Sequence, residues 1–129
     1  MNKLQKTSLV VLVVFYIVAG INHFRDPLSY IKIIPSYLPF PQFLNLAAGF
    51  FELVFATMLV FFKTRQLAAW GIILMLLAFL PVHISMIGDA PVKLGNMTVT
   101  PFLAWIRLLI LQPLLILWAW WTAGRKLLD

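Results

Sequence analysis

Four long apolar runs separated by short polar connections constrain this chain more than any other feature of its sequence. The runs cover about residues 7–24, 42–62, 66–87 and 101–122. Each is close to the roughly 20 residues that an α-helix needs to cross the hydrocarbon core of a bilayer. Because the backbone finds no water there, each segment must satisfy its own hydrogen bonds as a helix. The sequence therefore predicts a single domain over residues 1–129, an all-α membrane protein built as an antiparallel bundle of four transmembrane helices.

The composition favours a membrane protein over a soluble one. Hydrophobic residues make up 63% of the 129 residues and charged residues only 11%, whereas a soluble domain carries about 25% charged residues. The net charge of +6 comes from basic residues at the ends of the apolar runs. This distribution is typical of membrane topology and argues against nucleic-acid binding. The sequence contains no cysteine, which excludes disulfides and thiolate metal sites within it.

The distribution of basic residues predicts how the bundle is oriented. One side of the membrane would hold Lys3, Lys6, Lys63, Arg65, Arg125 and Lys126, and the other would hold Arg25, Lys32 and Lys93, partly offset by Asp26 and Asp89. The positive-inside rule then places the N- and C-termini in the cytoplasm. We expect a multi-pass protein of a cell membrane, most simply the bacterial inner membrane. We interpret the first run as a true span, because no A-x-A-like cleavage site follows it.

The connections between the runs differ in character. The four residues Lys63–Gln66 predict a tight turn, so the second and third runs would pack as an antiparallel pair. In the first connection, Asp26 is suited to cap a helix that has Pro27 at its first position. This helix, Leu28–Ile34, is predicted to be short and to lie in the outer membrane surface. The segment Gly88–Thr100 is rich in turn residues and is predicted to be a loop.

Polar side chains inside the apolar runs carry most of the functional information. They are Tyr16, Asn22, His23, Asn45, Glu52, His83, Arg107 and Gln112, and Tyr30 in the short helix joins them as a candidate. Embedded ionisable groups are costly, so they usually face the protein interior and find partners. With a rise of about 1.5 Å per residue, every one of these groups in the runs falls in the outer half or near the midplane. The sequence thus predicts a polar pocket that opens outward or sideways, above an inner half with almost no buried polarity.

Helical spacing predicts which of these groups share an interior. Polar and small residues lie on one face in two runs: Asn45, Gly49, Glu52 and Ala56 in the second, and Tyr16, Gly20 and His23 in the first. Small residues on such faces let helices approach closely. Glu52 and Arg107 are the only oppositely charged residues inside the runs, so we expect them to interact directly or through water. Their pair would be either a structural clasp or a functional site.

The histidines and a proline need separate interpretation. His23 lies at a membrane interface, where a solvated or helix-capping role is expected. His83 is deeper, and its role stays open between structure and function. Pro81 is expected to kink the third run. No H-x-x-x-H or E-x-x-H spacing supports a metal site, and no catalytic constellation is present, so neither a metal ligand nor a catalytic residue is assigned.

Several motifs resemble the DoxX-like family of small four-helix membrane proteins. The resemblance rests on Gly20–Phe24 with Pro27 and Tyr30, on Ala48–Leu53, on Pro81 with His83, and on Arg107–Leu109 with Gln112. It extends over nearly the whole chain and, more distantly, to the nicotinic-receptor assembly chaperone of the endoplasmic reticulum. The resemblance implies a four-helix fold. Its members include subunits of membrane redox complexes as well as that chaperone, so it leaves the function open.

Three functional hypotheses follow. The leading one is a non-catalytic accessory membrane protein that binds a membrane-protein partner or a lipid-like ligand through the outer-half pocket. The second is a quinone-interacting subunit of a membrane redox complex, in which quinone is the only cofactor considered. The third is a carrier of a small solute anchored by Arg107. The bilayer itself is a partner in all three, and a homo-oligomer is compatible with each.

Overall fold

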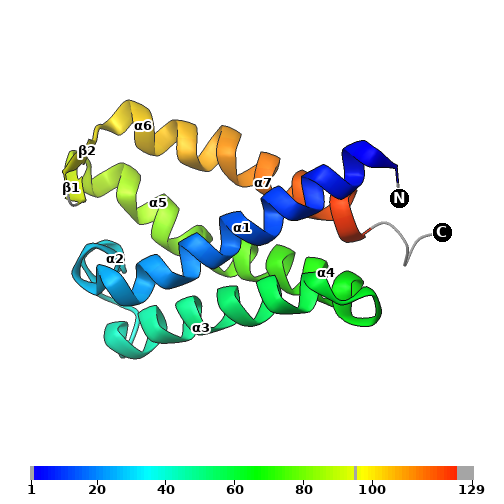
Figure 1. The fold of residues 1–129 in the computed structure, drawn as a ribbon. Coiled ribbons are helices and arrows are strands. Elements are labelled where there is room, and N and C mark those ends of the chain that lie inside the picture. The colour runs from blue at the N-terminus through cyan, green and yellow to red at the C-terminus, as the bar shows by residue number, and fades with distance from the viewer. Residues whose placement is uncertain (1, 95, 125–129) are drawn as a thin grey trace.

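Four long helical stretches run side by side in the structure, a computed structural model that describes residues 2–94 and 96–124 (Figure 1). The helices are α1 (Lys3–Arg25), α2 (Pro27–Ile33), α3 (Pro41–Val60), α4 (Phe62–Ala78), α5 (Leu80–Asp89), α6 (Pro101–Ile106) and α7 (Gln112–Ala119). Two π-helical segments, η1 (Arg107–Leu111) and η2 (Trp120–Gly124), complete the fourth stretch. The strands β1 (Val92–Leu94) and β2 (Met97–Val99) form an antiparallel hairpin.

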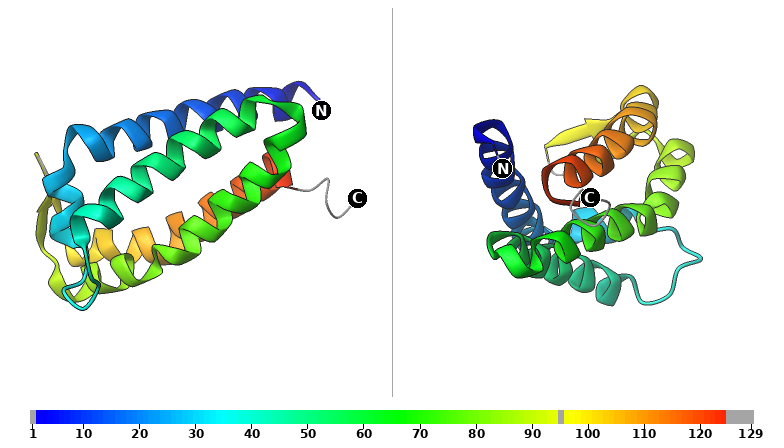
Figure 2. Two further views of the ribbon diagram at one scale, coloured as in Figure 1. Left: turned by 90° about the horizontal axis from the view of Figure 1, so that it is seen from below. Right: turned by 90° about the vertical axis from the view of Figure 1, so that its right-hand side faces the viewer.

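The four stretches match the four predicted spans. They are Lys3–Arg25, Pro41–Val60, Phe62–Asp89 and Pro101–Gly124, and each is long and apolar enough to cross a membrane. The prediction of a four-helix, all-α fold is confirmed at this level. The start of α1, the α3–α4 connection and the end of η2 lie at one end of the bundle, here called the terminal end (Figures 1 and 2). The opposite end holds α2 and the strands and is called the hairpin end. Arg125 and Lys126, used in the predicted orientation, lie outside the described residues.

Two glycines allow α1 and α3 to cross in close contact. A Cβ atom added at Gly49 would lie 2.7 Å from Cβ of His23, and one added at Gly20 would lie 2.8 Å from Cγ of Leu53. Both distances are shorter than real carbon atoms tolerate, so any larger residue would force the helices apart. The predicted small-residue faces are therefore the faces on which these two helices meet.

The connection between α3 and α4 is tighter than the sequence predicts. Phe61 alone separates the two helices, and Lys63–Gln66 forms the first turn of α4. The prediction of a turn at Lys63–Gln66 is wrong, although the predicted antiparallel packing is confirmed (Figure 2). The reason lies in side chains of α4: Oγ1 of Thr64 and Nε of Arg65 donate to the last free carbonyls of α3, at 2.8 Å each. These bonds let the chain re-enter a helix almost at once.

Prolines interrupt the third and fourth stretches. α4 ends and α5 begins around Phe79, with Pro81 in the first turn of α5. Because proline has no N–H to donate to the preceding turn, the helix breaks there and the predicted kink is confirmed. In the fourth stretch, η1 precedes Pro113, and the N–H of Gln112 donates to the carbonyl of Arg107, five residues back along the chain. A π-helical turn of this kind is often found where a helix carries a functional side chain.

The hairpin end contains one confirmed element and one corrected element. The predicted short helix is present as α2, with Pro27 in its first turn. Asp26 precedes α2, but its carboxylate accepts a hydrogen bond from the Ser29 hydroxyl (2.7 Å) instead of capping the backbone. The prediction of a plain loop over Gly88–Thr100 is wrong, since β1 pairs with β2 in the register Val92↔Val99, Lys93↔Thr98 and Leu94↔Met97.

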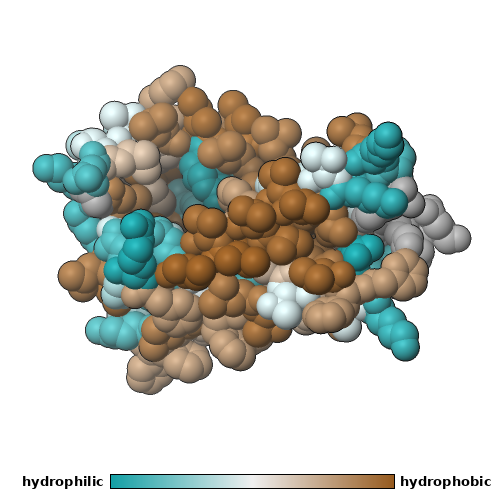
Figure 3. Space-filling model, viewed as in Figure 1, coloured by the Kyte–Doolittle hydropathy of each residue, from teal (hydrophilic) through white to brown (hydrophobic). Residues whose placement is uncertain are grey.

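Two apolar cores lie on either side of a group of buried polar side chains, here called the polar layer. The larger core lies toward the terminal end and contains Leu12, Tyr16, Ala56, Leu59, Ala68, Ala69, Ile72, Ile73, Met75, Leu76, Ala119 and Ala123. The smaller core lies toward the hairpin end and contains Met86, Val99 and Ala104. On the outside, apolar side chains cover the middle of the face in Figure 3, and hydrophilic residues gather at both ends. Such a belt is the surface expected of a bundle that spans a bilayer.

Candidate functional site

The nine predicted site residues form two clusters inside the polar layer. The His23 cluster is made by residues of α1, α2 and α3: Asn22, His23, Tyr30, Asn45 and Glu52. The Arg107 cluster is made by residues of α1, α5, η1 and α7: Tyr16, His83, Arg107 and Gln112. Along the helical stretches, the residues of both clusters lie near the middle of the bundle or nearer its hairpin end.

Asn45 fixes the position and the tautomer of His23. Nδ1 of His23 lies 2.8 Å from Oδ1 of Asn45, and Nδ2 of Asn45 donates to the backbone carbonyl of His23 at 3.0 Å. The second bond settles which end of the amide carries oxygen, because reversing the amide would place two acceptors face to face. Oδ1 can only accept, so Nδ1 of His23 carries a hydrogen and donates it. Nε2 is thereby left facing Glu52.

His23 and Glu52 face each other inside the bundle. Nε2 of His23 lies 3.4 Å from Oε2 of Glu52, and both side chains are buried. The distance is longer than a well-formed hydrogen bond, and Oε2 has no hydrogen-bond partner. The pair therefore links α1 and α3 through the close approach of an imidazole and a carboxyl group.

Tyr30 covers the His23 cluster on the side of the hairpin end. Its ring stacks on the ring of His23 with centroids 3.8 Å apart, and its hydroxyl accepts a 2.6 Å hydrogen bond from Nδ2 of Asn22. Oδ1 of Asn22 in turn accepts from Nη2 of Arg25 at 2.8 Å. Burial raises the pKa of Tyr30, so its hydroxyl stays neutral. A continuous row of contacts, two hydrogen bonds and one ring stack, thus joins the buried His23–Glu52 pair to the exposed Arg25.

One expectation about charged groups is wrong, and a second is wrong in part. His23 is not a solvated or capping residue at an interface, because only 7% of it is exposed and its ring is held on three sides. Glu52 and Arg107 are expected to interact directly or through water; they form no direct ion pair, and within residues 2–94 and 96–124 the one ion pair is His23–Glu52. The close crossing of α1 and α3 at Gly49 places His23, and not Arg107, beside Glu52.

Gln112 positions Arg107. Nη1 of Arg107 donates to Oε1 of Gln112 at 2.7 Å, and Nε2 of Gln112 donates to the carbonyl of Leu76. That carbonyl lies in the last turn of α4, where the break at Phe79 ends regular helical bonding. The helix break near Pro81 thus supplies the acceptor that anchors Gln112. The backbone of Leu76 is a contributor that side-chain patterns in the sequence do not reveal.

Two buried polar atoms next to Arg107 lack partners. Oη of Tyr16 and Nδ1 of His83 have no hydrogen-bond partner, although Tyr16 is only 2% exposed and His83 9%. Tyr16 interacts electrostatically with both Glu52 and Arg107, and His83 interacts electrostatically with Arg107. Buried polar groups in native proteins are nearly always satisfied, so unpaired ones indicate a water or ligand that completes the site.

The fourth stretch and α1 diverge on the side of these unpaired groups. Near the terminal end, α1 contacts η2, and Oγ of Ser8 lies 2.7 Å from Oγ1 of Thr122. Toward the hairpin end, α1 packs on α3 while α6 packs on α5 (Figure 1). Figure 3 shows hydrophilic side chains recessed in the hollow between the apolar side chains of α6 and those of α1. The polar layer is therefore reached from the side of the bundle.

The terminal end carries polar contacts that the sequence analysis did not identify. Besides the Ser8–Thr122 contact, Nε1 of Trp118 donates to Oγ of Ser8 at 2.8 Å, and Thr122 is only 2% exposed. The expectation of an inner half with almost no buried polarity is thus wrong at this end. The sequence did contain a signal for this contact: Ser8 lies at the start of the first run and Thr122 at the end of the fourth, so both hydroxyls are at the same end of the bundle.

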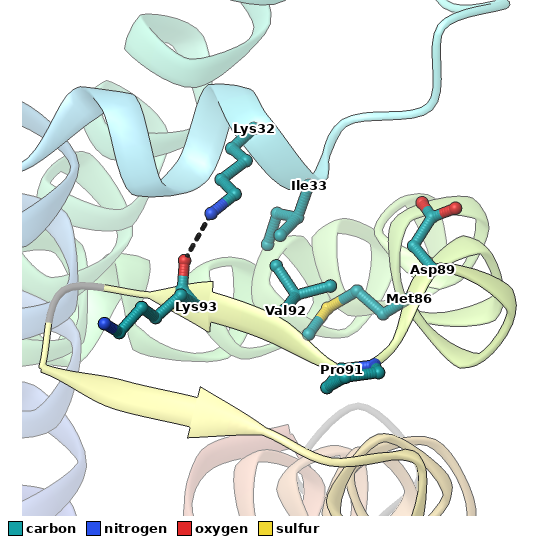
Figure 4. Close-up of a pocket in the computed structure, with 7 residues that line it drawn as sticks. All are labelled: Lys32, Ile33, Met86, Asp89, Pro91, Val92 and Lys93. Carbon is teal, nitrogen blue, oxygen red and sulfur yellow. Dashed lines mark hydrogen bonds between the residues drawn. The ribbon is translucent and has the colours of Figure 1, made fainter.

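A pocket of about 450 Å³ lies at the hairpin end, away from both clusters (Figure 4). It is lined by Lys32 and Ile33 of α2, Met86 and Asp89 of α5, and Pro91, Val92 and Lys93 of the hairpin. Nζ of Lys32 crosses it to donate to the carbonyl of Lys93 at 2.8 Å. None of the nine predicted residues lines this pocket. Across the part of the chain that the structure describes, no group of three or more His, Cys, Asp or Glu residues is placed to hold a metal ion.

Comparison with known proteins gives a family and no activity. No curated protein and no solved structure matches the chain. Residues 12–123 match a family described as "Domain of unknown function (DUF8561)". This match contains both polar clusters, the second and third helical stretches, the first stretch from residue 12 onward and the fourth stretch up to residue 123. Because the match covers most of the chain, the protein belongs to the DUF8561 family.

Proposed function

We propose that this protein is a multi-pass membrane protein that binds a lipid-like ligand through the hollow above the Arg107 cluster and acts as a non-catalytic accessory protein. In this proposal the terminal end faces the cytoplasm, because Lys3, Lys6, Lys63 and Arg65 lie there. The hairpin end faces the opposite side, and α2 lies in that membrane surface. The bacterial inner membrane is the setting that fits these features most simply.

The unpaired polar atoms of Tyr16 and His83 carry the proposal. They lie beside Arg107, at a depth where a bilayer offers no bulk water. Figure 3 shows a hollow on the side of the bundle in which hydrophilic side chains lie recessed among outward-facing apolar side chains. A molecule with a polar head and an apolar tail would satisfy the polar atoms with its head while its tail stays among the lipids. A water-soluble ligand has no such reason to enter from the side.

An accessory role accords with the composition of the site and with the DoxX-like resemblance. The two clusters contain no nucleophile activated by a base and no paired carboxylates for acid–base catalysis. The motifs that resemble the DoxX-like family, such as Asn22–His23 and Arg107 with Gln112, are the ones that build the two clusters. We infer that these motifs serve ligand binding, with a partner membrane protein as the second component.

Native mass spectrometry of the purified protein in mild detergent tests this function. The wild-type protein should retain a non-covalent adduct with the mass of a membrane amphiphile. The variant Gln112→Leu, which removes the residue that positions Arg107, should retain at least 5-fold less. Lys63→Ala, which removes an exposed positive charge at the other end, serves as the matched control and should retain the adduct. A wild-type protein that carries no adduct in several detergents would overturn the proposal.

A quinone-interacting subunit is the second candidate, and the close approach of His23 and Glu52 favours it. Reduction of a quinone takes up protons as well as electrons, and a buried imidazole beside a carboxyl group is suited to deliver a proton to a quinone oxygen. Tyr30, stacked on His23, supplies an aromatic face of the kind that accommodates a quinone ring. A partner redox protein would supply the electrons.

Quinone binding is measured by titrating a short-chain ubiquinone or menaquinone into the purified protein and following tryptophan fluorescence. Saturable quenching that weakens at least 5-fold in His23→Leu, and that is unchanged in the control Lys63→Ala, is the expected result. Equal quenching in wild type and His23→Leu would remove this candidate.

A further inference from the structure

Within residues 2–94 and 96–124, no acidic group forms an ion pair with Arg107. Away from the helix ends, Glu52 is the only acidic residue in the four stretches, and its carboxylate lies against His23. The charge of Arg107 therefore has no acidic partner in this part of the chain. In the described part of the chain, Arg107 makes one hydrogen bond, to the neutral side chain of Gln112.

A charge of this kind is costly to bury without a partner of opposite sign. Arg107 is half-buried, and it lies in the middle of a stretch long and apolar enough to cross a membrane. A guanidinium has five N–H groups arranged in a rigid fork, and this one uses a single N–H in the described structure. The rest of the fork is free to receive two oxygens at once, as carboxylates and phosphates do.

The two unpaired atoms next to Arg107 suit the same chemistry. The hydroxyl of Tyr16 can donate a hydrogen bond, and so can Nδ1 of His83 in the tautomer that carries its hydrogen there. Both side chains are more than nine-tenths buried. The free-energy cost of burying their unpaired polar atoms is therefore offset only when a hydrogen-bond acceptor binds beside them. Three different elements, α1, α5 and η1, therefore each carry a buried or half-buried donor, and no described acidic side chain forms an ion pair or hydrogen bond with any of the three.

We propose that Arg107, Tyr16 and His83 form a binding site for the anionic head group, a carboxylate or a phosphate, of an amphiphile that enters between α1 and α6. This inference rests on the proposed lipid-binding function and names the class of its ligand. The head group would take the guanidinium in bidentate geometry and accept from the other two donors.

Probes that share one alkyl chain and differ in the head group test the inference. Oleate, oleoyl lysophosphatidate and the neutral monoolein are titrated into the full-length protein in nanodiscs of zwitterionic lipid, and binding is followed by native mass spectrometry. Oleate or lysophosphatidate should bind at least 10-fold more tightly than monoolein. Arg107→Gln should abolish this preference, and Arg107→Lys should restore part of it, since a lysine keeps the charge and loses the bidentate fork.

The other possible outcomes distinguish failure of the anionic site from failure of the proposed lipid-binding function. If monoolein binds as tightly as the anionic probes and Arg107→Gln changes nothing, the anionic site is overturned and the lipid-binding function stands. If none of the three amphiphiles binds, both are overturned.

Acetate and inorganic phosphate serve as probes without a tail. Binding of either one as tight as that of oleate would support the anion site and overturn an amphiphile as its ligand. Tyr16→Phe, which keeps the ring and removes the unpaired hydroxyl, should weaken oleate about 5-fold without unfolding the protein.

Discussion

His23 and Glu52 lie on different helices and face each other across 3.4 Å, with His23 held in one tautomer by Asn45. This relationship depends on the crossing of α1 and α3, which two glycines make possible. It also gives Glu52 a neighbour other than Arg107, so within the described residues Arg107 has no acidic partner.

The pairing of Glu52 predicts which double-mutant cycle shows coupling. In a cycle of His23→Leu and Glu52→Leu, the interaction free energy should be about 0.5–3 kcal/mol, because each single change leaves the other group buried without its partner. A cycle of Glu52→Leu and Arg107→Leu should give a clearly smaller coupling. Unfolding in mixed micelles, followed by tryptophan fluorescence, supplies the free energies. A larger coupling between Glu52 and Arg107 would contradict the observed pairing.

The contact at Gly49 predicts a strong effect of one methyl group. Gly49→Ala should destabilise the protein by about 1–3 kcal/mol, because the added carbon collides with Cβ of His23 and forces α1 away from α3. The control is Gly88→Ala in α5, where an added Cβ meets no atom within 4 Å. Helix propensity should make that variant neutral or more stable by about 0.5–1 kcal/mol. Thermal unfolding in detergent measures both, and equal midpoints for the two variants would refute the close crossing.

Gln112 is predicted to contribute more to the free energy of unfolding than an exposed polar residue does. Gln112→Leu should cost about 1–3 kcal/mol, since it leaves a buried carbonyl of Leu76 and a guanidinium N–H of Arg107 without their partner. Gln42→Leu, an exposed position in the first turn of α3, is the matched control and should change stability by less than about 0.5 kcal/mol. The chemical denaturation midpoint in detergent distinguishes them. Similar midpoints would show that Gln112 does not hold Arg107 in place.

The hydroxyl contact at the terminal end predicts a smaller loss. Thr122→Val preserves shape and removes the hydrogen bond with Ser8, so it should cost about 0.5–1.5 kcal/mol. The same substitution at the exposed Thr57, whose hydroxyl bonds only within its own helix, should stay within about 0.5 kcal/mol of the wild type. Thermal unfolding again provides the comparison, and a Thr57→Val loss equal to that of Thr122→Val would argue against closure at this end.

The proposed topology predicts opposite accessibility of the two ends of the bundle. The chain has no cysteine, so Lys63→Cys and Lys93→Cys each introduce a single reactive thiol. In intact cells a membrane-impermeant maleimide should label the cysteine at position 93, whereas the one at position 63 should react only after permeabilisation. Labelling of both positions in intact cells would refute a protein that spans the membrane with its terminal end in the cytoplasm.

The sequence alone determined the four long helical stretches and the break near Pro81. A run of about 20 apolar residues allows few alternatives, and a proline cannot continue the hydrogen bonding of a helix, so the four stretches and the kink at Pro81 were predictable. Periodicity also placed Asn45, Gly49 and Glu52 on one face of α3. These are local properties, because they depend only on residues close together in the chain.

The tertiary structure decided which faces meet and which groups pair. Depth and periodicity give the face of a helix that carries Glu52 or Arg107, but not the neighbouring helix that this face contacts. The close approach at Gly49 brings His23 to Glu52, and the break after α4 offers the carbonyl of Leu76 to Gln112, which holds Arg107 elsewhere. The sequence identified Glu52 and Arg107 as buried charged residues. Only the packing of the helices decided that they do not form a direct pair, because a buried charged group pairs with the partner that the fold brings closest.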